Sequence, residues 1–279
     1  MAEVRTGKDS PEQAYYENEA LWAQDFEQDP QERARLIAAS QLIPEGTNSI
    51  LDAGCGNGAF VNRLSGKYGR VCGVDRSEVA LSFVRTEKRL ARVDKLPFAS
   101  GEFDLVACME VIEHLPQGVY EQALSEIGRV ASKWVLISVP YREDRRLGLV
   151  RCPKCSCEFN RSYHLRSFDE RSLSSLFRDV HPDIGLVSLR TVGDTVRYIG
   201  LRTARRMAEP FRTPALPRGV VCPQCAHSRE AAMPTAPQND PTGALGRARV
   251  LWPRVRSPRW AMAMYRKRAG DERPQRGGP

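Results

Sequence analysis

Two carboxylates and three glycines in the first third of the chain have the types and spacing of a ligand-binding turn. An apolar run ends at Asp52, and Gly54, Gly56 and Gly58 follow at alternate positions. Glycines there let a buried strand turn abruptly into a helix and leave main-chain N–H groups open to a ligand. Asp75 closes the next apolar run, where a carboxylate can accept both hydroxyl protons of a ribose. The pattern predicts a nucleotide-type cofactor site.

The position of Asp52 separates two classes of cofactor. Residues 54–59 also fit G-x-G-x-x-[GA], the short and weakly specific fingerprint of dinucleotide-binding proteins. A carboxylate two residues before the first glycine would repel a pyrophosphate, but it can meet an ammonium group. We therefore expect a cofactor with an amino-acid head and no phosphate. An NAD enzyme stays as an alternative.

The elements that must position these residues alternate between strand-like and helix-like patterns. Strands are predicted at 50–51, 70–74, 90–93, 103–109, 133–139, 185–192 and 260–265, and helices at 12–26, 31–42, 59–67, 78–88, 120–130, 167–178 and 198–208. Such alternation indicates a parallel sheet with helices on both faces and right-handed crossovers. The aromatic residues of the first helix (Tyr15, Tyr16, Trp22 and Phe26) favour core packing over a second role, closing over a ligand.

Four motifs in order resemble class I S-adenosylmethionine-dependent methyltransferases of the type 11 kind. They are Leu51-Asp-Ala-Gly-Cys-Gly-Asn-Gly58, Gly73-Val-Asp75, Leu96-Pro-Phe98 followed by Phe103-Asp-Leu-Val106, and Glu110-Val-Ile-Glu-His-Leu115. The resemblance covers about residues 48–141. It implies a Rossmann-like, doubly wound α/β sheet of seven strands, mostly parallel, whose last strand is antiparallel. It also implies S-adenosyl-L-methionine as the cofactor.

Cofactor contacts carried over from the resemblance fall on two acids and their neighbours. Asp52 would hold the glycine turn and the amino group of the cofactor, and Asp75 would bind the ribose hydroxyls. The other implied cofactor-binding residues are Gly54, Cys55 and Gly56 near the methionine part, Arg76, Val93 and Asp94 around the adenine, and Met109 near the methionine carboxylate. Many relatives carry an acid four residues before the Leu-Pro-Phe, where this chain has Arg92.

Methyl transfer from a sulfonium needs an aligned acceptor and, for an acceptor of high pKa, a general base. His114 follows the fourth predicted strand at the carboxyl edge of the sheet and is the candidate base. Its alternative role is to pack and hydrogen-bond at a helix start. Glu110 and Glu113 are as consistent with structure as with function, and Tyr141 is a further candidate on the acceptor side.

Eight cysteines in a chain with no signal-peptide pattern indicate metal ligands or buried thiols more than disulfides. Cys152-Pro-Lys-Cys155 and Cys222-Pro-Gln-Cys225 are two C-P-x-C knuckles, which together predict a structural tetrahedral Zn²⁺ site. Cys157, His164 and His227 are spare ligands, and a redox pair or free thiols are the alternatives. Both knuckles lie in connections that, in the fold the resemblance implies, emerge at the carboxyl edge of the sheet, so we expect zinc to join them into a cap over the acceptor site.

The pattern divides the chain into seven segments. They are N-terminal helices (1–47), the cofactor-binding core (48–141), a first Cys-rich insertion (142–166), a core helix and strand (167–193), a second Cys-rich insertion with a Pro-rich linker (194–256), a last core strand (257–266) and a disordered basic tail (267–279). The stretch from Cys152 to Phe168 weakly resembles methyltransferases near bacterial glycan and natural-product pathways, which implies O-methylation.

The net charge of +8 is concentrated at the C-terminal end. We expect a cytoplasmic enzyme with no membrane span that methylates a small-molecule or sugar-containing acceptor. An RNA base methyltransferase is the alternative that the knuckles and the basic end suit. A module that binds the cofactor without turning it over is another.

Overall fold

The computed structural model describes residues 11–198, 216–217, 220–228 and 254–268. The chain forms two compact units. The first comprises Met1–Tyr15, Asp144–His164 and Asp194–Pro258, and the second Tyr16–Glu143, Leu165–Gly193 and Arg259–Pro279. The predicted helix at 198–208, most of the predicted linker and the end of the basic tail lie outside the described residues.

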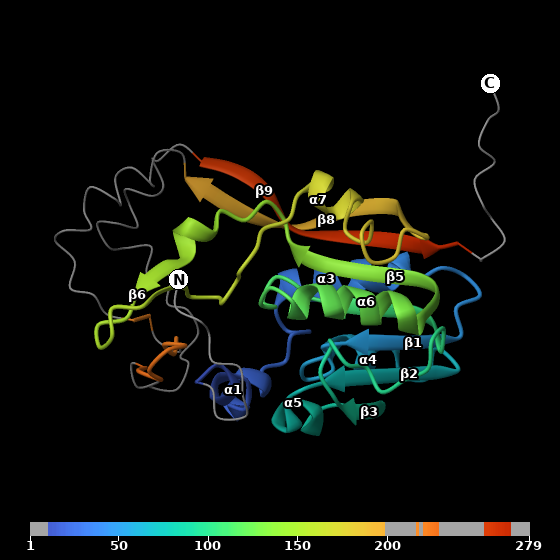
Figure 1. Ribbon diagram of the computed structural model, residues 1–279, viewed down its shortest axis with the longest axis horizontal. Coiled ribbons are helices and arrows are strands. Elements are labelled where there is room, and N and C mark those ends of the chain that lie inside the picture. Colours follow the sequence, from blue (N-terminus) through green and yellow to red (C-terminus); the bar gives the residue numbers. More distant parts are fainter. Residues whose placement is uncertain (1–10, 199–215, 218–219, 229–253, 269–279) are drawn as a thin grey trace. The chain divides into compact units, whose positions relative to one another are not determined.

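A seven-stranded sheet forms the centre of the second unit (Figure 1). Its order is β3-β2-β1-β4-β5-β9-β8. The strands are β1 (Ser49–Ala53), β2 (Arg70–Asp75), β3 (Glu87–Leu90), β4 (Phe103–Met109), β5 (Ala131–Pro140), β8 (Ile184–Tyr198) and β9 (Arg254–Lys267). The strands from β3 to β5 pair in parallel, and β9 pairs antiparallel with β5. This confirms the predicted sheet with its antiparallel last strand.

Helices cover both faces of this sheet, as the alternating pattern predicts. On one face α6 (Val119–Val130) and α7 (Glu170–Ser174) pack on alternate strand residues such as Leu51 and Val106. On the other face α3 (Pro30–Leu42), α4 (Ala59–Leu64) and α5 (Glu78–Ser82) pack on the residues between, such as Ile50 and Leu105. Because both faces are covered, the central strands are buried throughout, which explains their continuous apolar sequence.

Two predicted helices differ from the structure. The helix predicted at 12–26 is broken into α1 (Pro11–Tyr16) and α2 (Glu19–Trp22). The carbonyl oxygen of Tyr16 accepts hydrogen bonds from the Trp22 indole N–H and from the Ser77 hydroxyl. The helix predicted at 78–88 stops after α5, and residues 87–90 form strand β3 instead of the predicted strand at 90–93. Strand β3 pairs with the buried strand β2, so pairing overrides the helical pattern of its exposed side chains.

The described part of the first unit is built around a short hairpin. Strands β6 (Leu149–Arg151) and β7 (Glu158–Asn160) pair antiparallel after the 3₁₀ turn η1 (Arg145–Gly148). The Tyr163 hydroxyl donates to the carbonyl oxygen of Val221 at 2.6 Å, and so ties the hairpin to the second Cys-rich segment. The small core consists of Cys152, Phe159, Leu216, Val220 and Cys222. Among the described residues no helix has the length and apolar character to cross a membrane.

Candidate cofactor site and four-cysteine cluster

The glycine turn after β1 has the backbone shape that the sequence predicts. Gly54, Gly56 and Gly58 have φ values of 85°, 54° and 80°. The main-chain N–H groups of Gly54 and Cys55 donate to the carbonyl oxygen of Val74 at 2.7 and 2.8 Å, which fixes the turn against β2. A Cβ at Gly54 would lie 2.5 Å from a methyl group of Val111. Positive φ and close packing therefore both require glycine here.

Asp75 joins the end of β2 to this turn. Its Oδ2 accepts a hydrogen bond from the Gly56 N–H at 2.8 Å, and its Oδ1 accepts one from the Ser77 N–H at 3.0 Å. Burial raises the pKa of the Asp75 carboxyl, and these N–H donors oppose the shift. The side chain that sequence analysis assigns to ribose hydroxyls thus also orders the glycine turn.

Asp52, beside the glycine turn, is a buried acid with an unsatisfied carboxylate oxygen. Its side chain is 1% exposed, and Oδ1 has no hydrogen-bond partner among the described residues. Burial raises its pKa to about 7, with Arg35 lowering it and Asp75 raising it further. A buried carboxyl at the end of a strand, beside a glycine turn and short of a donor, is suited to the ammonium group of a ligand.

Arg35 was not found by sequence analysis. It lies on α3 and is 8% exposed, its Nη2 pairs with Glu32 at 2.9 Å, and Nη1 has no hydrogen-bond partner among the described residues. Its charge acts on both Asp52 and Glu113. Its burial could have been inferred from the sequence, because Arg35 lies one helical turn before Ala38 and Ala39 on the buried side of the helix.

Trp22 of the N-terminal segment packs against the glycine turn, and Phe26 packs against the core. A Cβ at Gly56 would lie 2.7 Å from the Trp22 ring. The Asn57 side-chain amide donates to the carbonyl oxygen of Trp22 at 2.9 Å. Tyr16 lies with its ring under the Arg76 guanidinium, 4.6 Å from centroid to Cζ, and 6.5 Å from the His114 ring.

On the predicted adenine side, Arg92 holds Asp94. The guanidinium donates to both carboxylate oxygens of Asp94, at 2.9 and 3.0 Å. Val93 lies between them in sequence and is half-buried. The arginine that departs from the pattern of many relatives is therefore the partner of the neighbouring acid.

The segment after β4 carries the predicted catalytic residues. Met109 is 8% exposed at the strand end, and Glu110 has a φ of 57°. The Ser138 hydroxyl donates to Glu110 Oε1 at 2.6 Å. Glu113 is 1% exposed, and neither carboxylate oxygen has a hydrogen-bond partner among the described residues. Glu113 Oε1 lies 3.8 Å from His114 Nε2.

Electrostatics favour a protonated Glu113. Burial raises the pKa of its carboxyl well above the usual range, and the negative charge of Glu110 raises it further. Tyr141, the other candidate on the acceptor side, is buried and its hydroxyl donates to the Glu170 carboxylate. The structure therefore places Glu113 and His114 together, whereas Tyr141 is already paired.

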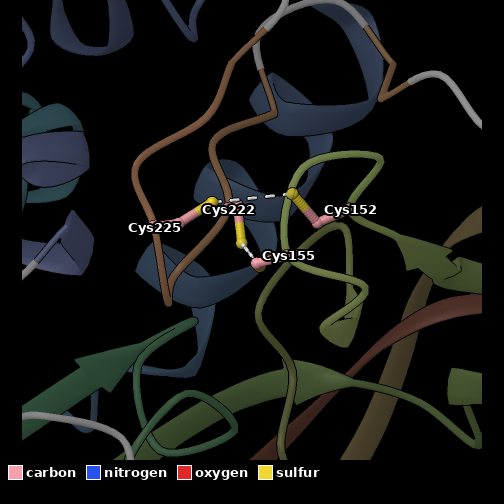
Figure 2. Close-up of side chains that lie close together, drawn as sticks. All are labelled: Cys152, Cys155, Cys222 and Cys225. Atoms are coloured by element: carbon pink, nitrogen blue, oxygen red, sulfur yellow. Dashed lines mark hydrogen bonds between the residues drawn. The ribbon is translucent and has the colours of Figure 1, made fainter.

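The two knuckles bring their four sulfur atoms together (Figure 2). Cys152 Sγ lies 3.6 Å from Cys225 Sγ, and Cys155 Sγ lies 3.5 Å from Cys222 Sγ. All four ligand atoms lie within 4.8 Å of one another. Four thiolates around Zn²⁺ at ~2.3 Å have sulfur atoms about 3.8 Å apart, so the cluster fits a tetrahedral zinc site.

The two knuckles also share one main-chain geometry. In the first, the Ser156 N–H donates to Cys152 O and the Cys152 N–H donates to Cys157 O, both at 2.9 Å. In the second, the Ala226 N–H donates to Cys222 O at 3.0 Å and the Cys222 N–H donates to His227 O at 2.8 Å. The residue after each second cysteine has positive φ, 61° at Ser156 and 57° at Ala226. The repeat in sequence is thus a repeat in structure.

Comparison with known proteins agrees with this fold. Residues 51–135 match the Methyltransf_11 family, described as a methyltransferase domain. The ubiquinone biosynthesis O-methyltransferase of Thiobacillus denitrificans is 34% identical over 92 residues, which is 29% of this chain and 40% of that protein. The chain thus spans about two fifths of the length of this curated relative.

Solved structures show the same fold at low identity. A putative methyltransferase from Bacillus halodurans has a TM-score of 0.52 and 13% identity, over 84% of this chain and 99% of that one. The [4+2]-cyclase SpnF has a TM-score of 0.52 and 14% identity, over 89% and 87%. These structures agree with the fold, and the family match places a methyltransferase domain at residues 51–135, with both C-P-x-C knuckles outside the matched residues.

Proposed function

We propose that this protein transfers the methyl group of S-adenosylmethionine to a hydroxyl group of a small molecule, which can carry a sugar. The observation that carries the proposal is the buried Asp52 carboxyl beside the glycine turn, whose Oδ1 has no hydrogen-bond partner among the described residues. The carboxylate would attract the ammonium group of a cofactor and would repel a pyrophosphate. The relative from Thiobacillus denitrificans, an O-methyltransferase of ubiquinone biosynthesis, supports oxygen as the acceptor atom.

The residues of the turn fit the cofactor part by part. Asp52 would meet its amino group, and Arg35 Nη1 offers a donor for its carboxylate. Asp75 would hold the ribose hydroxyls while it orders Gly56. Gly54, Cys55, Arg76, Val93, Asp94 and Met109 remain the other proposed contacts. When bound, S-adenosylmethionine supplies an electrophilic methyl group, and the acceptor oxygen takes that methyl as it loses its proton.

A labelled methyl group tests the reaction itself. The full chain would be incubated with a small-molecule extract and S-adenosylmethionine carrying a deuterated methyl group. We expect labelled methyl ethers by mass spectrometry, together with S-adenosylhomocysteine. The fold alone does not decide this point, because SpnF shares it and is a cyclase. Label found only in RNA would replace our acceptor class, and cofactor binding without any labelled product would indicate a non-catalytic module.

His114 is the proposed general base that accepts the hydroxyl proton. Its side chain is 24% exposed, and Glu113 lies behind its Nε2. Replacing His114 by Gln is expected to lower kcat by ~10²-fold or more, the usual contribution of a general base. S-adenosylhomocysteine affinity, measured by calorimetry, should stay unchanged because the cofactor contacts remain. A kcat within a few-fold of the natural protein would assign His114 a structural role.

We further propose that Cys152, Cys155, Cys222 and Cys225 hold one structural Zn²⁺. The sulfur spacings and the repeated knuckle geometry support four thiolate ligands. Four protein ligands leave no open position, so this metal would stabilise the first unit and not take part in catalysis. Cys157, His164 and His227 are outside this group of four.

A further inference from the structure

The segment that carries Glu113 and His114 accepts hydrogen bonds on its main-chain carbonyl groups from Leu165 and Arg166, which lie about fifty residues later in the chain. Leu165 N–H donates to the carbonyl oxygen of Glu113 at 2.7 Å. Arg166 Nη1 donates to the carbonyl oxygen of Ile112 at 2.8 Å and to that of Leu115. Three of four consecutive carbonyl oxygens thus bind the dipeptide 165–166. We call residues 110–117 the β4 loop.

Arg166 is itself fixed by an aromatic contact. Its Cζ lies 3.9 Å from the centroid of the Tyr120 ring, and Tyr120 is in the first turn of α6. A guanidinium can stack on a ring and donate in its own plane at the same time, which a lysine ammonium cannot do. The stacking therefore orients the donor that binds Ile112 and Leu115. The side chain links the β4 loop to the start of the helix that follows it.

The β4 loop has few main-chain hydrogen bonds of its own. The Glu110 N–H donates to Ser138 O at 2.9 Å, and the His114 N–H donates to Val111 O at 3.0 Å. The loop also begins at Glu110 with φ 57°, a conformation that non-glycine residues rarely adopt. Within the loop the carbonyl groups of Ile112, Glu113 and Leu115 accept from outside the loop, so the donors of Leu165 and Arg166 help to fix where Glu113 and His114 lie.

The chemical need for such a clamp lies in Glu113. Its buried carboxylate oxygens have no hydrogen-bond partner among the described residues, so its side chain does not anchor the loop by itself. Burying an unpaired carboxyl costs free energy and favours conformations in which the loop opens to water. The donors of Leu165 and Arg166 oppose that opening.

We propose that Arg166 is a positioning residue that holds the β4 loop so that His114 faces the acceptor, with Glu113 buried beside it. Arg166 contacts main-chain carbonyl groups and does not itself touch the reacting atoms. The kinetic part of this proposal rests on the proposed methyl transfer. Its structural part does not, because the clamp is a property of the free protein.

Hydrogen–deuterium exchange of the full chain tests the structural part. Arg166→Ala should raise exchange in peptides covering residues 110–118 by ~10-fold or more, with the strands β1 and β2 unaffected. S-adenosylhomocysteine should bind both proteins within about 2-fold, because Asp52 and Asp75 lie on other strands. Arg171→Ala, at an exposed position of α7, is the matched control and should change neither quantity. If Arg166→Ala does not fold, Arg166→Lys carries the same test.

Turnover tests the kinetic part, with the acceptor identified by methyl labelling. Arg166→Ala should lower kcat by ~10²-fold, the cost of misplacing a catalytic group by about 1 Å, with little change in cofactor affinity. Unchanged exchange in the β4 loop would overturn the proposal. So would increased exchange throughout the sheet, which would make Arg166 a general stabilising residue. If the natural protein binds S-adenosylhomocysteine but transfers no methyl group, the proposed function fails while the exchange result still decides the clamp.

Discussion

Replacing Asp52 with asparagine is expected to stabilise the ligand-free protein at pH 8 and to abolish cofactor binding. The pKa of the Asp52 carboxyl is raised from 3.8 to about 7, first of all by burial. At pH 8 the folded chain must therefore hold a buried carboxylate that the neutral amide avoids. A rise of the pKa from 3.8 to about 7 corresponds to ~4 kcal/mol in the free energy of unfolding, measurable by urea titration.

The pH dependence has a definite sign. Between the unfolded pKa of 3.8 and the folded pKa of about 7, the native state keeps a proton that the unfolded state releases. The contribution of Asp52 to stability is therefore fully present below the lower pKa and is lost as pH rises through the upper one. The stability difference between the Asp52→Asn variant and the natural protein should grow over this range and level off above it.

Cofactor affinity should change with pH in the opposite direction to stability. An ammonium group pairs with the carboxylate and not with the carboxylic acid, so S-adenosylhomocysteine affinity should rise as pH increases through about 7, with proton release. Calorimetry in buffers of different ionisation enthalpy measures that release directly. Cofactor affinity equal to the natural protein's in Asp52→Asn would remove Asp52 from the site.

Asp104 provides a control of opposite sign. Its carboxylate accepts a hydrogen bond from Lys133, and it also accepts from the N–H groups of Asn48 and Ser49 at 2.9 and 3.1 Å. Its pKa is lowered to about 2, first of all by Lys133. Asp104→Asn should therefore destabilise the protein at neutral pH and leave S-adenosylhomocysteine affinity unchanged. Stabilisation by both substitutions would point to a general effect of removing negative charge.

The sequence was enough to predict the sheet and the turn because their constraints are local. Strand β1 must end in glycines, since Gly54 has positive φ and a Cβ there would collide with Val111. Strand β3 was predicted three residues too late, at 90–93, because pairing with β2, and not its exposed side chains, decides its conformation. Local pattern cannot report a partner strand that overrides it.

Contacts between charged residues on different elements could not be predicted from the sequence, for a different reason. Arg35 and Asp52 lie on separate elements, and only the folded chain brings the arginine into electrostatic contact with the acid. Arg166 lies in the stretch from Cys152 to Phe168 that weakly resembles other methyltransferases, but its hydrogen bonds to Ile112 and Leu115 cross more than fifty residues. In contrast, Arg92 and Asp94 are two residues apart and their pairing was accessible. Spacing predicts contacts within an element far better than contacts between elements.

The cysteine cluster was predicted in part from the sequence. The repeated C-P-x-C spacing predicted two equal knuckles, and the sulfur atoms of Cys152, Cys155, Cys222 and Cys225 do converge. The spacing could not rank the spare ligands. The structure ranks them, because the sulfur atoms of the four knuckle cysteines form a group that could hold a metal, and Cys157, His164 and His227 are not in that group.

Loss of one ligand cysteine is expected to release the metal and unfold the first unit. The protein as purified should contain about one zinc ion per chain by mass spectrometry, and Cys152→Ser or Cys222→Ser should contain almost none. The described core of that unit has five buried residues, too few to compensate for the loss. Structural Zn²⁺ contributes ~10–16 kcal/mol of apparent binding free energy in zinc-finger peptides, so its removal should open the knuckles completely.

Cys157→Ser supplies the matched control for this experiment, because it removes a thiol from the same hairpin but lies outside the group of four. It should retain zinc and the exchange protection of residues 149–160 and 220–228. Chelation of the natural protein should reproduce the exchange pattern of Cys152→Ser, while strands β1 to β5 stay protected by their own core. Equal zinc loss in Cys157→Ser would reassign a ligand. A natural protein that holds no zinc, yet keeps its knuckles protected, would refute the site, because the Tyr163–Val221 hydrogen bond and the small core would then be enough to hold the two segments together.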